Sequence, residues 1–168
     1  HKKARHDLLQ HVVVNDSLRQ TAHMIGLLQR VTEAEVRVAG TSIGRIGTGL
    51  LVLIGVERDD TTDHADRLIE RLLGYRVFPD AAGKMNRSLL DISGGLLLVP
   101  NFTLPADTRK GTRPGFSKGA DPATGERLFN YVVEQARPRL LQVASGQFGA
   151  DMQVSLTNNG PVTFWLQT

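Results

Sequence analysis

The 168-residue sequence contains no cysteine, and aromatic residues make up only 5% of it. The absence of cysteine excludes disulfide bonds, thiol nucleophiles and metal centres held by thiolates. Long hydrophobic runs are missing too: the longest, such as residues 50–56, reach about half of the roughly 20 residues that a membrane-spanning helix needs. The remaining composition, 40% hydrophobic and 22% charged, is typical of a globular domain. We therefore expect a single domain with no membrane partner.

Histidine is scarce where chemistry would need it. Four of the five histidines precede Met24, and His64 alone lies in the rest of the chain. His64 follows Thr61 at the start of a predicted helix, where a capping or solvated role is expected. Because histidine is the usual general base near neutral pH and the commonest metal ligand, any enzyme built on this chain is expected to work without a histidine base. We predict no bound metal and no cofactor.

The chain divides at Met24. Residues 1–23 are polar and rich in histidine, and they end directly before the first strongly patterned segment. We interpret residues 1–23 as an N-terminal extension and residues 24–168 as the folded domain.

Short apolar or alternating runs predict several strands between residue 25 and the C-terminus. An apolar stripe at helical spacing predicts a helix over residues 62–75, and Asp121 followed by Pro122 predicts the start of a second. We expect an α+β fold in which a curved or closed mixed sheet is flanked by two main helices. Because several strands are too apolar to leave one face wet, we also expect a homodimer. The predicted strands are residues 25–31, 34–38, 42–46, 50–56, 94–99, 151–157 and 161–167.

A loop rich in cations follows the strand at residues 94–99. Residues 108–120 contain four cations and no acidic residue, namely Arg109, Lys110, Arg113 and Lys118. Such a loop attracts the phosphates of a polyanion. The alternative interpretation is a solvated loop whose charge serves solubility.

Two further features suggest a site. An Xaa-Pro bond such as Gly160-Pro161 prefers the trans form only weakly, so a fold can hold it cis and aim its backbone carbonyls into a pocket. The alternative there is a simple hairpin turn. Thr103 lies at the end of a predicted buried strand, but threonine is a weak nucleophile without an activating base, and no base is nearby. A hydrogen-bonding role is therefore the alternative for Thr103.

Two signatures in this order carry a family resemblance. Phe102-Thr103-Leu104 matches the end of one signature, and the stretch 158–163 (NNGPVT) matches a second. Smaller collinear blocks accompany them at residues 29–31, 83–86, 113–120 and 151–156. From Met24 to Thr168 the chain resembles the D-aminoacyl-tRNA deacylases.

The resemblance implies a cytoplasmic homodimer that hydrolyses the ester between tRNA and a D-amino acid or achiral glycine, including glycine mischarged on tRNA(Ala). It also implies that a cis Gly160-Pro161 of one subunit enters the pocket of the other, where its carbonyls exclude L side chains, and that Arg30 holds this motif. Candidate catalytic residues are Thr103 and Phe102. The residues expected to bind substrate or select its chirality are Gly160, Pro161, Asn158, Arg30, Asn101, Pro100 and Met152, and those expected to bind tRNA are Arg109, Lys110, Arg113 and Lys118.

For a family of this kind, the group that activates the attack is either Thr103 or the 2′-hydroxyl of the tRNA, and the residues of this chain help to choose between them. With no cysteine, no plausible catalytic histidine and no base beside Thr103, the chain lacks the parts of a triad, which favours assistance by the 2′-hydroxyl of the tRNA. Backbone N–H groups around Phe102 and Thr103 are expected to stabilise the oxyanion. Pro100 and Asn101 stand where the family usually has Ser-Gln, which removes one backbone donor and shortens one side chain. The other functions considered are a non-catalytic RNA-binding module and a structural dimerisation domain.

Overall fold

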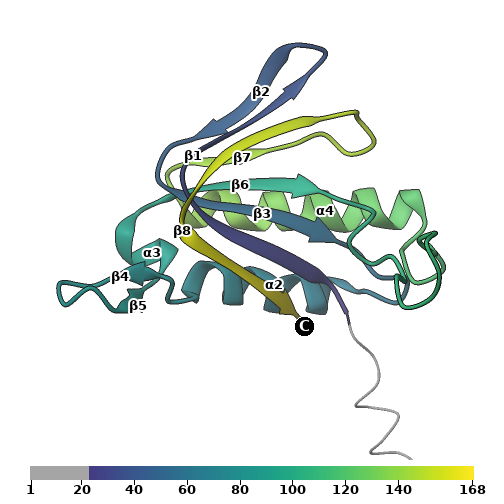
Figure 1. Cartoon of the computed structure of the whole chain (residues 1–168), viewed down its shortest axis with the longest axis horizontal. Helices are drawn as coiled ribbons and strands as arrows, with labels where there is room; N and C mark the ends of the chain where they lie inside the picture. The colour runs from purple at the N-terminus through teal and green to yellow at the C-terminus, as the bar shows by residue number, and fades with distance from the viewer. Residues whose placement is uncertain (1–22) are drawn as a thin grey trace, which may run out of the picture.

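The structure, a computed structural model, describes residues 23–168 and shows an α+β fold (Figure 1). Its main sheet has the strand order β2-β1-β3-β6-β7, and β8 pairs with the other edge of β1. Pairs made by β1 are antiparallel, whereas β3, β6 and β7 run parallel, so the sheet is mixed as expected. The strands are β1 (Ile25–Val38), β2 (Thr41–Ile46), β3 (Gly49–Gly55), β6 (Gly95–Pro100), β7 (Val143–Ser145) and β8 (Gln153–Gln167).

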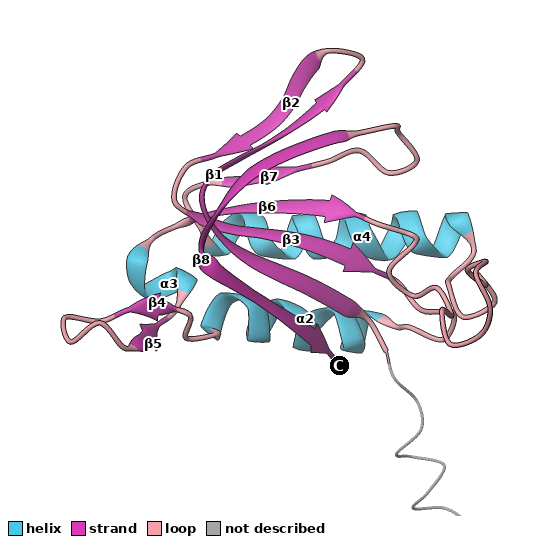
Figure 2. Cartoon of the chain, viewed as in Figure 1, coloured by secondary structure: helices cyan, strands magenta, loops and turns pink. Residues whose placement is uncertain are grey.

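Two helices cover one face of this sheet, as Figure 2 shows. Helix α2 (Thr62–Gly74) begins at a capping box formed by Thr61 and His64, and α4 (Pro122–Ala136) begins at Asp121, whose side chain accepts a hydrogen bond from Thr124 N. Both helices and the capping role of His64 are confirmed. Their apolar stripes bury Leu68 and Leu72 of α2 and the matching stripe of α4 against the sheet in one large core. A short segment that the patterns did not predict joins α2 to β6: β4 (Phe78–Pro79), β5 (Met85–Arg87) and α3 (Leu89–Ile92). A 3-10 turn, η1 (Arg137–Arg139), follows α4.

The two longest strands differ from the prediction. Residues 25–31 and 34–38 form the single strand β1, and residues 153–167 form the single strand β8 rather than two strands around a turn. The hairpin-turn interpretation of Gly160-Pro161 is therefore wrong. The register between the two strands shifts opposite β1 residues 29–33, where β8 passes through Asn158 and Gly160. Turn-forming residues here act as a bulge that bends a continuous strand, a role that a residue pattern alone does not distinguish from a turn.

The second face of the sheet is concave and nearly closes on itself. The edge strand β2 lies beside β7, and the Gln142 side chain donates to the backbone carbonyl of Arg45 at 3.4 Å. A second core lies inside this curve, formed by Val31, Ala34, Val36, Ile46, Leu51, Leu97 and Val99. The prediction of a curved or closed sheet with two flanking helices is confirmed. Across residues 23–168, no helix combines the length and apolar character that crossing a membrane requires.

Part of the concave face has no cover within the described chain. Leu27 and Leu53 are half-buried there, and Trp165 of β8 is 51% exposed. Uncovered apolar side chains of this kind are usual at protein interfaces. The homodimer stays a prediction.

Candidate active site

A cleft of about 660 Å³ opens on the concave side of the sheet. Its walls come from β3, the end of β6, the start of α4 and the first half of β8. Four residues expected at a substrate site line it, namely Pro100, Asn101, Phe102 and Met152. The rest of the wall is mostly apolar and was not among the predicted site residues: Gln29, Leu51, Leu53, Val99, Ala120, Pro122, Phe148, Gly149, Ala150, Val154 and Leu156. The uninterrupted apolar run at residues 50–54 was the available signal, because it places apolar side chains on both faces of β3.

The floor of the cleft is the segment that follows β6. Asn101 N donates to the carbonyl of Ile54 at 2.8 Å, which anchors the segment to β3. The Asn101 side-chain oxygen accepts both from Thr103 N at 3.1 Å and from Thr103 Oγ1 at 2.5 Å. The Thr103 hydroxyl is thus tied to an amide oxygen, which is not a base. Within residues 23–168, the backbone N–H of Phe102 has no hydrogen-bond partner, and Phe102 lines the cleft.

Two exposed aromatic rings lie next to each other, one in the cleft wall and one in an adjoining pocket. Phe102 is 72% exposed and Phe116 is 50% exposed, and their ring centroids lie 5.7 Å apart. Phe116 belongs to the cation-rich loop at residues 108–120 (hereafter the basic loop), so this loop reaches the cleft. Phe116 was not among the predicted site residues, although an aromatic residue inside a basic segment of a chain poor in aromatics was a usable signal.

The Met152 side chain in the cleft wall packs directly against the backbone of Gly146. A side chain at Gly146 would place its Cβ 2.7 Å from the Met152 sulfur, which real contacts do not allow. The same sulfur lies 3.4 Å from Gln147 N. The absence of a side chain at Gly146 therefore leaves room for the Met152 side chain in its present position.

The Gly160-Pro161 motif lies elsewhere on the chain. The Gly160-Pro161 bond is cis, and both residues are exposed and absent from the cleft wall. Gly160 has φ of +151°, and a Cβ there would lie 2.6 Å from Val162 Cγ2, so only glycine fits.

Asn158 and Arg30 hold this motif by hydrogen bonds on both sides. Asn158 Oδ1 accepts from Val162 N at 2.7 Å, and Asn158 Nδ2 donates to the Val162 carbonyl at 3.1 Å and to Thr163 Oγ1 at 3.0 Å. Arg30 donates through Nε to the carbonyl of Asn159 at 2.8 Å and through Nη1 to the carbonyl of Val77 at 2.7 Å. The side chains expected to support the motif are thus in contact with its flanks.

The predicted site residues therefore form two groups within one chain. Pro100, Asn101, Phe102 and Met152 share the cleft, with Thr103 beside them. Gly160, Pro161, Asn158 and Arg30 form the second group, on the bend of β8. Within one subunit Gly160 and Pro161 do not line the cleft, although Asn158 Nδ2 donates to Oε1 of Gln29, a residue of the cleft wall, at 3.4 Å.

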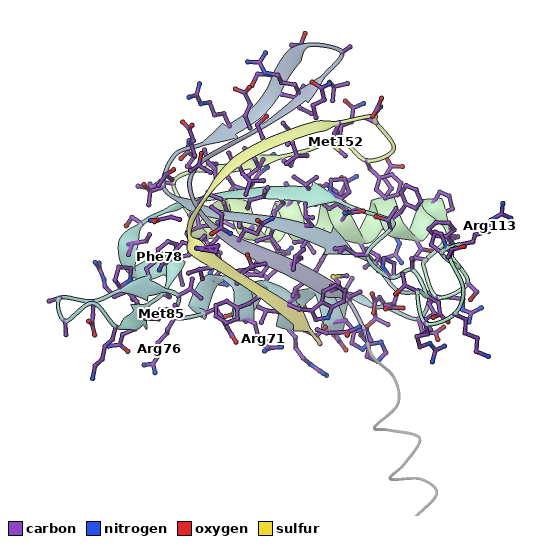
Figure 3. The ribbon with its side chains drawn as sticks, viewed as in Figure 1. Arg71, Arg76, Phe78, Met85, Arg113 and Met152 are labelled. Carbon is purple, nitrogen blue, oxygen red and sulfur yellow. The ribbon has the colours of Figure 1, made fainter. Side chains whose placement is uncertain are left out.

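The basic loop carries less free charge than its composition indicated. Arg109 donates to both carboxylate oxygens of Asp107, at 2.9 and 2.7 Å, and this pairing holds the pKa of Asp107 far below its usual range. Among residues 23–168, no carboxylate lies within 4.0 Å of Lys110, Arg113 or Lys118. Figure 3 shows Arg113 at the right-hand end of the molecule. The loop thus offers three unpaired cations rather than four.

Near the start of the described chain, His23, Asp60 and His64 place potential ligand atoms within 4.8 Å of one another. Hydrogen bonds already occupy ligand atoms of Asp60 and His64, whereas His23 Nδ1 is buried without a hydrogen-bond partner among the described residues. The buried carboxylate of Asp60 accepts from Met24 N at 2.9 Å and Glu57 N at 2.7 Å, and His64 Nδ1 accepts from Thr61 N at 2.9 Å. The two imidazole rings stack with centroids 3.6 Å apart, which stops a metal from lying in the plane of both. This group therefore fits a structural role better than a metal centre.

Comparison with known proteins decides the family. A profile described as D-Tyr-tRNA(Tyr) deacylase matches residues 27–167. The chain belongs to this deacylase family. The resemblance read from the two signatures is confirmed, and with it the prediction that the chain is an enzyme of the D-aminoacyl-tRNA deacylase class.

Individual relatives agree with this assignment. The D-aminoacyl-tRNA deacylase of Alkalilimnicola ehrlichii is 62% identical over 144 residues, which cover 86% of this chain and 96% of that protein. The D-aminoacyl-tRNA deacylase of Pseudomonas fluorescens is 61% identical over 145 residues and is covered completely, along with 86% of this chain.

Solved structures of this deacylase fold are also similar. A protein described as c-Myc DNA unwinding element binding protein matches with a TM-score of 0.82 and 36% identity, over 86% of this chain and 98% of that one. A probable eukaryotic D-amino acid tRNA deacylase matches with a TM-score of 0.78 over 86% and 99% of the two chains. Because the second shares only 18% identity, it supports the fold alone.

Proposed function

We propose that this protein hydrolyses the ester bond between a D-amino acid and the 3′ end of tRNA, in the cytoplasm, where tRNA is aminoacylated. The proposal rests on membership of the deacylase family together with the cleft at residues 100–103, where an unpartnered backbone donor adjoins an apolar wall. The relatives that are about 60% identical carry the name of this activity.

The chemistry follows from what the cleft contains. An aminoacyl ester is already activated, so a positioned water and one or more oxyanion donors supply much of the required acceleration. The Phe102 N–H is the available donor, whereas the Thr103 N–H is occupied by Asn101. The Thr103 hydroxyl donates to the same amide oxygen and has no base to activate it. The 2′-hydroxyl of the terminal ribose is the remaining group that can assist proton transfer.

The rings of Phe102 and Phe116 provide a platform for the last base of the tRNA. Both rings are exposed, Phe102 belongs to the cleft wall, and unpaired bases bind proteins largely by stacking on aromatic side chains. Stacking of the terminal adenine there places its ribose ester over the segment that contains the Phe102 N–H.

Selection against L-amino acids requires the second group of residues. In a homodimer, the Gly160-Pro161 motif of one subunit enters the cleft of the other and presents backbone carbonyls where an L side chain would project. Three observations support this arrangement: the motif is exposed, Asn158 and Arg30 fix its position, and the sheet face around Trp165 is uncovered. A backbone wall cannot relax as a side-chain pocket can, so it rejects one enantiomer more steeply than the roughly 1–3 kcal/mol that a methylene is worth.

Glycine has no side chain for such a wall to exclude. The same site therefore accepts glycine mischarged on tRNA(Ala), and the protein needs neither metal nor cofactor for this hydrolysis. The wall acts by exclusion rather than by affinity, so side chains of several D-amino acids are tolerated.

The test is to incubate the purified protein with D-Tyr-tRNA, L-Tyr-tRNA and glycyl-tRNA(Ala) and to follow loss of each ester. Rapid loss of the first and third and persistence of the second support the proposal. A matched control is Ala150→Trp, which fills the cleft from its wall and is expected to stop turnover. Binding of all three without turnover would instead indicate a non-catalytic RNA-binding module, and no affinity at any salt concentration would indicate a dimerisation domain.

A further inference from the structure

A second group of cations lies at the end of α2 and on the β4-β5 hairpin. It consists of Arg71, Arg76, Lys84 and Arg87, all exposed, and is called here the hairpin surface. Figure 3 shows Arg76 beside the hairpin residue Met85 and Arg71 further along the same lower edge, whereas Arg113 of the basic loop lies at the other end. The hairpin surface is therefore separate from the basic loop.

The charge of the hairpin surface is available to a ligand. Among residues 23–168, none of its four cations has a carboxylate within 4.0 Å, in contrast to the paired Arg109 and Arg139. The nearby carboxylates accept hydrogen bonds from backbone groups rather than from these cations: Asp80 accepts from Ala82 N and Lys84 N, and Asp91 accepts from Ser88 N. The hydrogen bonds from Ser88, and then the charges of Arg87 and Arg76, lower the pKa of Asp91. Unpaired guanidinium groups suit the bidentate binding of phosphate.

The hairpin surface is also fixed to the Gly160-Pro161 motif. Arg30 bridges the carbonyl of Asn159, next to the motif, and the carbonyl of Val77, next to Arg76. Arg71 donates to the carbonyl of Gln167 at the end of the same strand β8. Wherever the motif docks, the hairpin surface accompanies it.

We propose that the hairpin surface of one subunit binds phosphates of the tRNA whose 3′ end lies in the cleft of the other subunit. The inference rests on the proposed function, because a motif inserted into the partner's cleft brings its own hairpin surface to the rim of that cleft. The chain of the tRNA leaves the cleft at that rim as a single strand and continues into the double-helical acceptor stem, and both present phosphates to the protein. Each tRNA then lies between the basic loop of one subunit and the hairpin surface of the other.

The first experiment removes the two cations whose side chains make no hydrogen bond in the described chain, in the double variant Arg76→Ala, Lys84→Ala. We expect kcat/KM for D-Tyr-tRNA to fall tenfold or more at about 150 mM salt, where phosphate binding still contributes to affinity. The slope of log affinity for tRNA against log salt should flatten by about one for each phosphate that the variant no longer binds. The ester of D-tyrosine with adenosine alone lacks those phosphates, and its hydrolysis should not change. The matched control, Arg45→Ala with Arg127→Ala, removes two exposed arginines on β2 and α4 and should leave both substrates unaffected.

Affinity for uncharged tRNA is measured in parallel, which separates the two proposals. If the wild type cleaves neither ester, the deacylase function fails, while weaker binding by the double variant still supports the hairpin surface. Unchanged tRNA affinity, salt dependence and kcat/KM in the double variant overturn the hairpin surface, whatever the activity.

Mixed dimers test its placement across subunits. One subunit carries Ala150→Trp in the cleft, the other carries Arg76→Ala with Lys84→Ala, and two affinity tags purify the mixed dimer. Across subunits, the open cleft meets an intact hairpin surface, so about half of the wild-type kcat/KM for D-Tyr-tRNA is expected. Activity no higher than that of the double variant, or failure of the chains to associate, overturns the placement.

Discussion

The segment after β6 and the bend of β8 are built in contrasting ways. At residues 100–103, Phe102 is largely exposed and Thr103 has a single side-chain partner, Asn101. Around Gly160-Pro161, Asn158 and Arg30 together contribute several hydrogen bonds to backbone groups on both sides of the motif. The segment proposed to exclude L substrates is therefore held by side-chain hydrogen bonds. At the proposed reaction centre, the groups available for chemistry are backbone donors and the tRNA itself.

The largest effect is expected from Arg30→Ala. Two carbonyls lose a charged donor, which should lower the free energy of unfolding by about 2–3 kcal/mol. The Gly160-Pro161 motif would then be able to move away from an L side chain. We expect the ratio of D-Tyr-tRNA to L-Tyr-tRNA hydrolysis to fall tenfold or more, measured with urea denaturation alongside. Arg30→Lys keeps the charge but cannot bridge both carbonyls, so its D-to-L ratio should lie between those of the wild type and Arg30→Ala. A D-to-L ratio equal to that of the wild type would remove the supporting role of Arg30.

Asn158→Asp should act in the same direction and less strongly. The carboxylate can still accept from Val162 N but cannot donate to the Val162 carbonyl or to Thr163, at a cost of about 1–2 kcal/mol in unfolding free energy. Asn159→Asp is the matched control, because the Asn159 side chain makes no hydrogen bond within the described chain. Equal losses in the two variants would show that charge, rather than the missing donors, is responsible.

A pH effect of about 1 kcal/mol is expected from Glu57, which lies outside both regions. Burial, and then the charge of Asp60, raise its pKa from 4.5 to about 7, so the folded state binds more protons than the unfolded state between those values. The stability from this group is present below about pH 4.5 and is lost as pH rises to about 7. Because Glu57 is partly exposed, solvent screening reduces the contribution of this pKa shift to the free energy of unfolding. Glu57→Gln should flatten the curve of unfolding free energy against pH between about pH 4.5 and 7. If the curves of the variant and the wild type run parallel there, Glu57 is not the group responsible.

The smallest effect is expected at the reaction centre itself. Thr103→Ala removes a hydroxyl that has no base, so the single-turnover rate on D-Tyr-tRNA should stay within about threefold of the wild type. The Asn101 side-chain oxygen still accepts from the backbone N–H of residue 103 in this variant, which preserves the loop. Abolished turnover with intact folding and tRNA binding would reject assistance by the 2′-hydroxyl.

The contrast between the two regions also explains how far the sequence alone could lead. Helices α2 and α4 could be predicted from their apolar stripes and capping residues, and strand β3 from its apolar run. These signals lie within the element itself and need no knowledge of its neighbours. The continuous path of β8 did not follow, since Asn158 and Gly160 have the composition of a turn and only pairing with β1 shows that they form a bulge. The pairing of Arg109 with Asp107, one residue before the basic loop, was equally invisible to a count that began at residue 108.

The candidate site was predictable where a signature named it and not where topology assembled it. Phe102, Pro161 and Arg30 were found through family signatures. Leu53 lines the cleft and Phe116 lies against Phe102 only because a loop and a strand face meet in three dimensions. That the Gly160-Pro161 motif lies outside its own subunit's cleft could not be read from spacing along the chain.

The most direct test of the central claim is the D-to-L rate ratio of Pro161→Gly. Glycine removes the ring that fixes the backbone, so the proposed wall becomes flexible while the cleft is untouched. We expect L-Tyr-tRNA hydrolysis to rise tenfold or more and D-Tyr-tRNA hydrolysis to stay within a few-fold of the wild type. Undiminished rejection of L-Tyr-tRNA by a folded, active variant would contradict selection by this backbone.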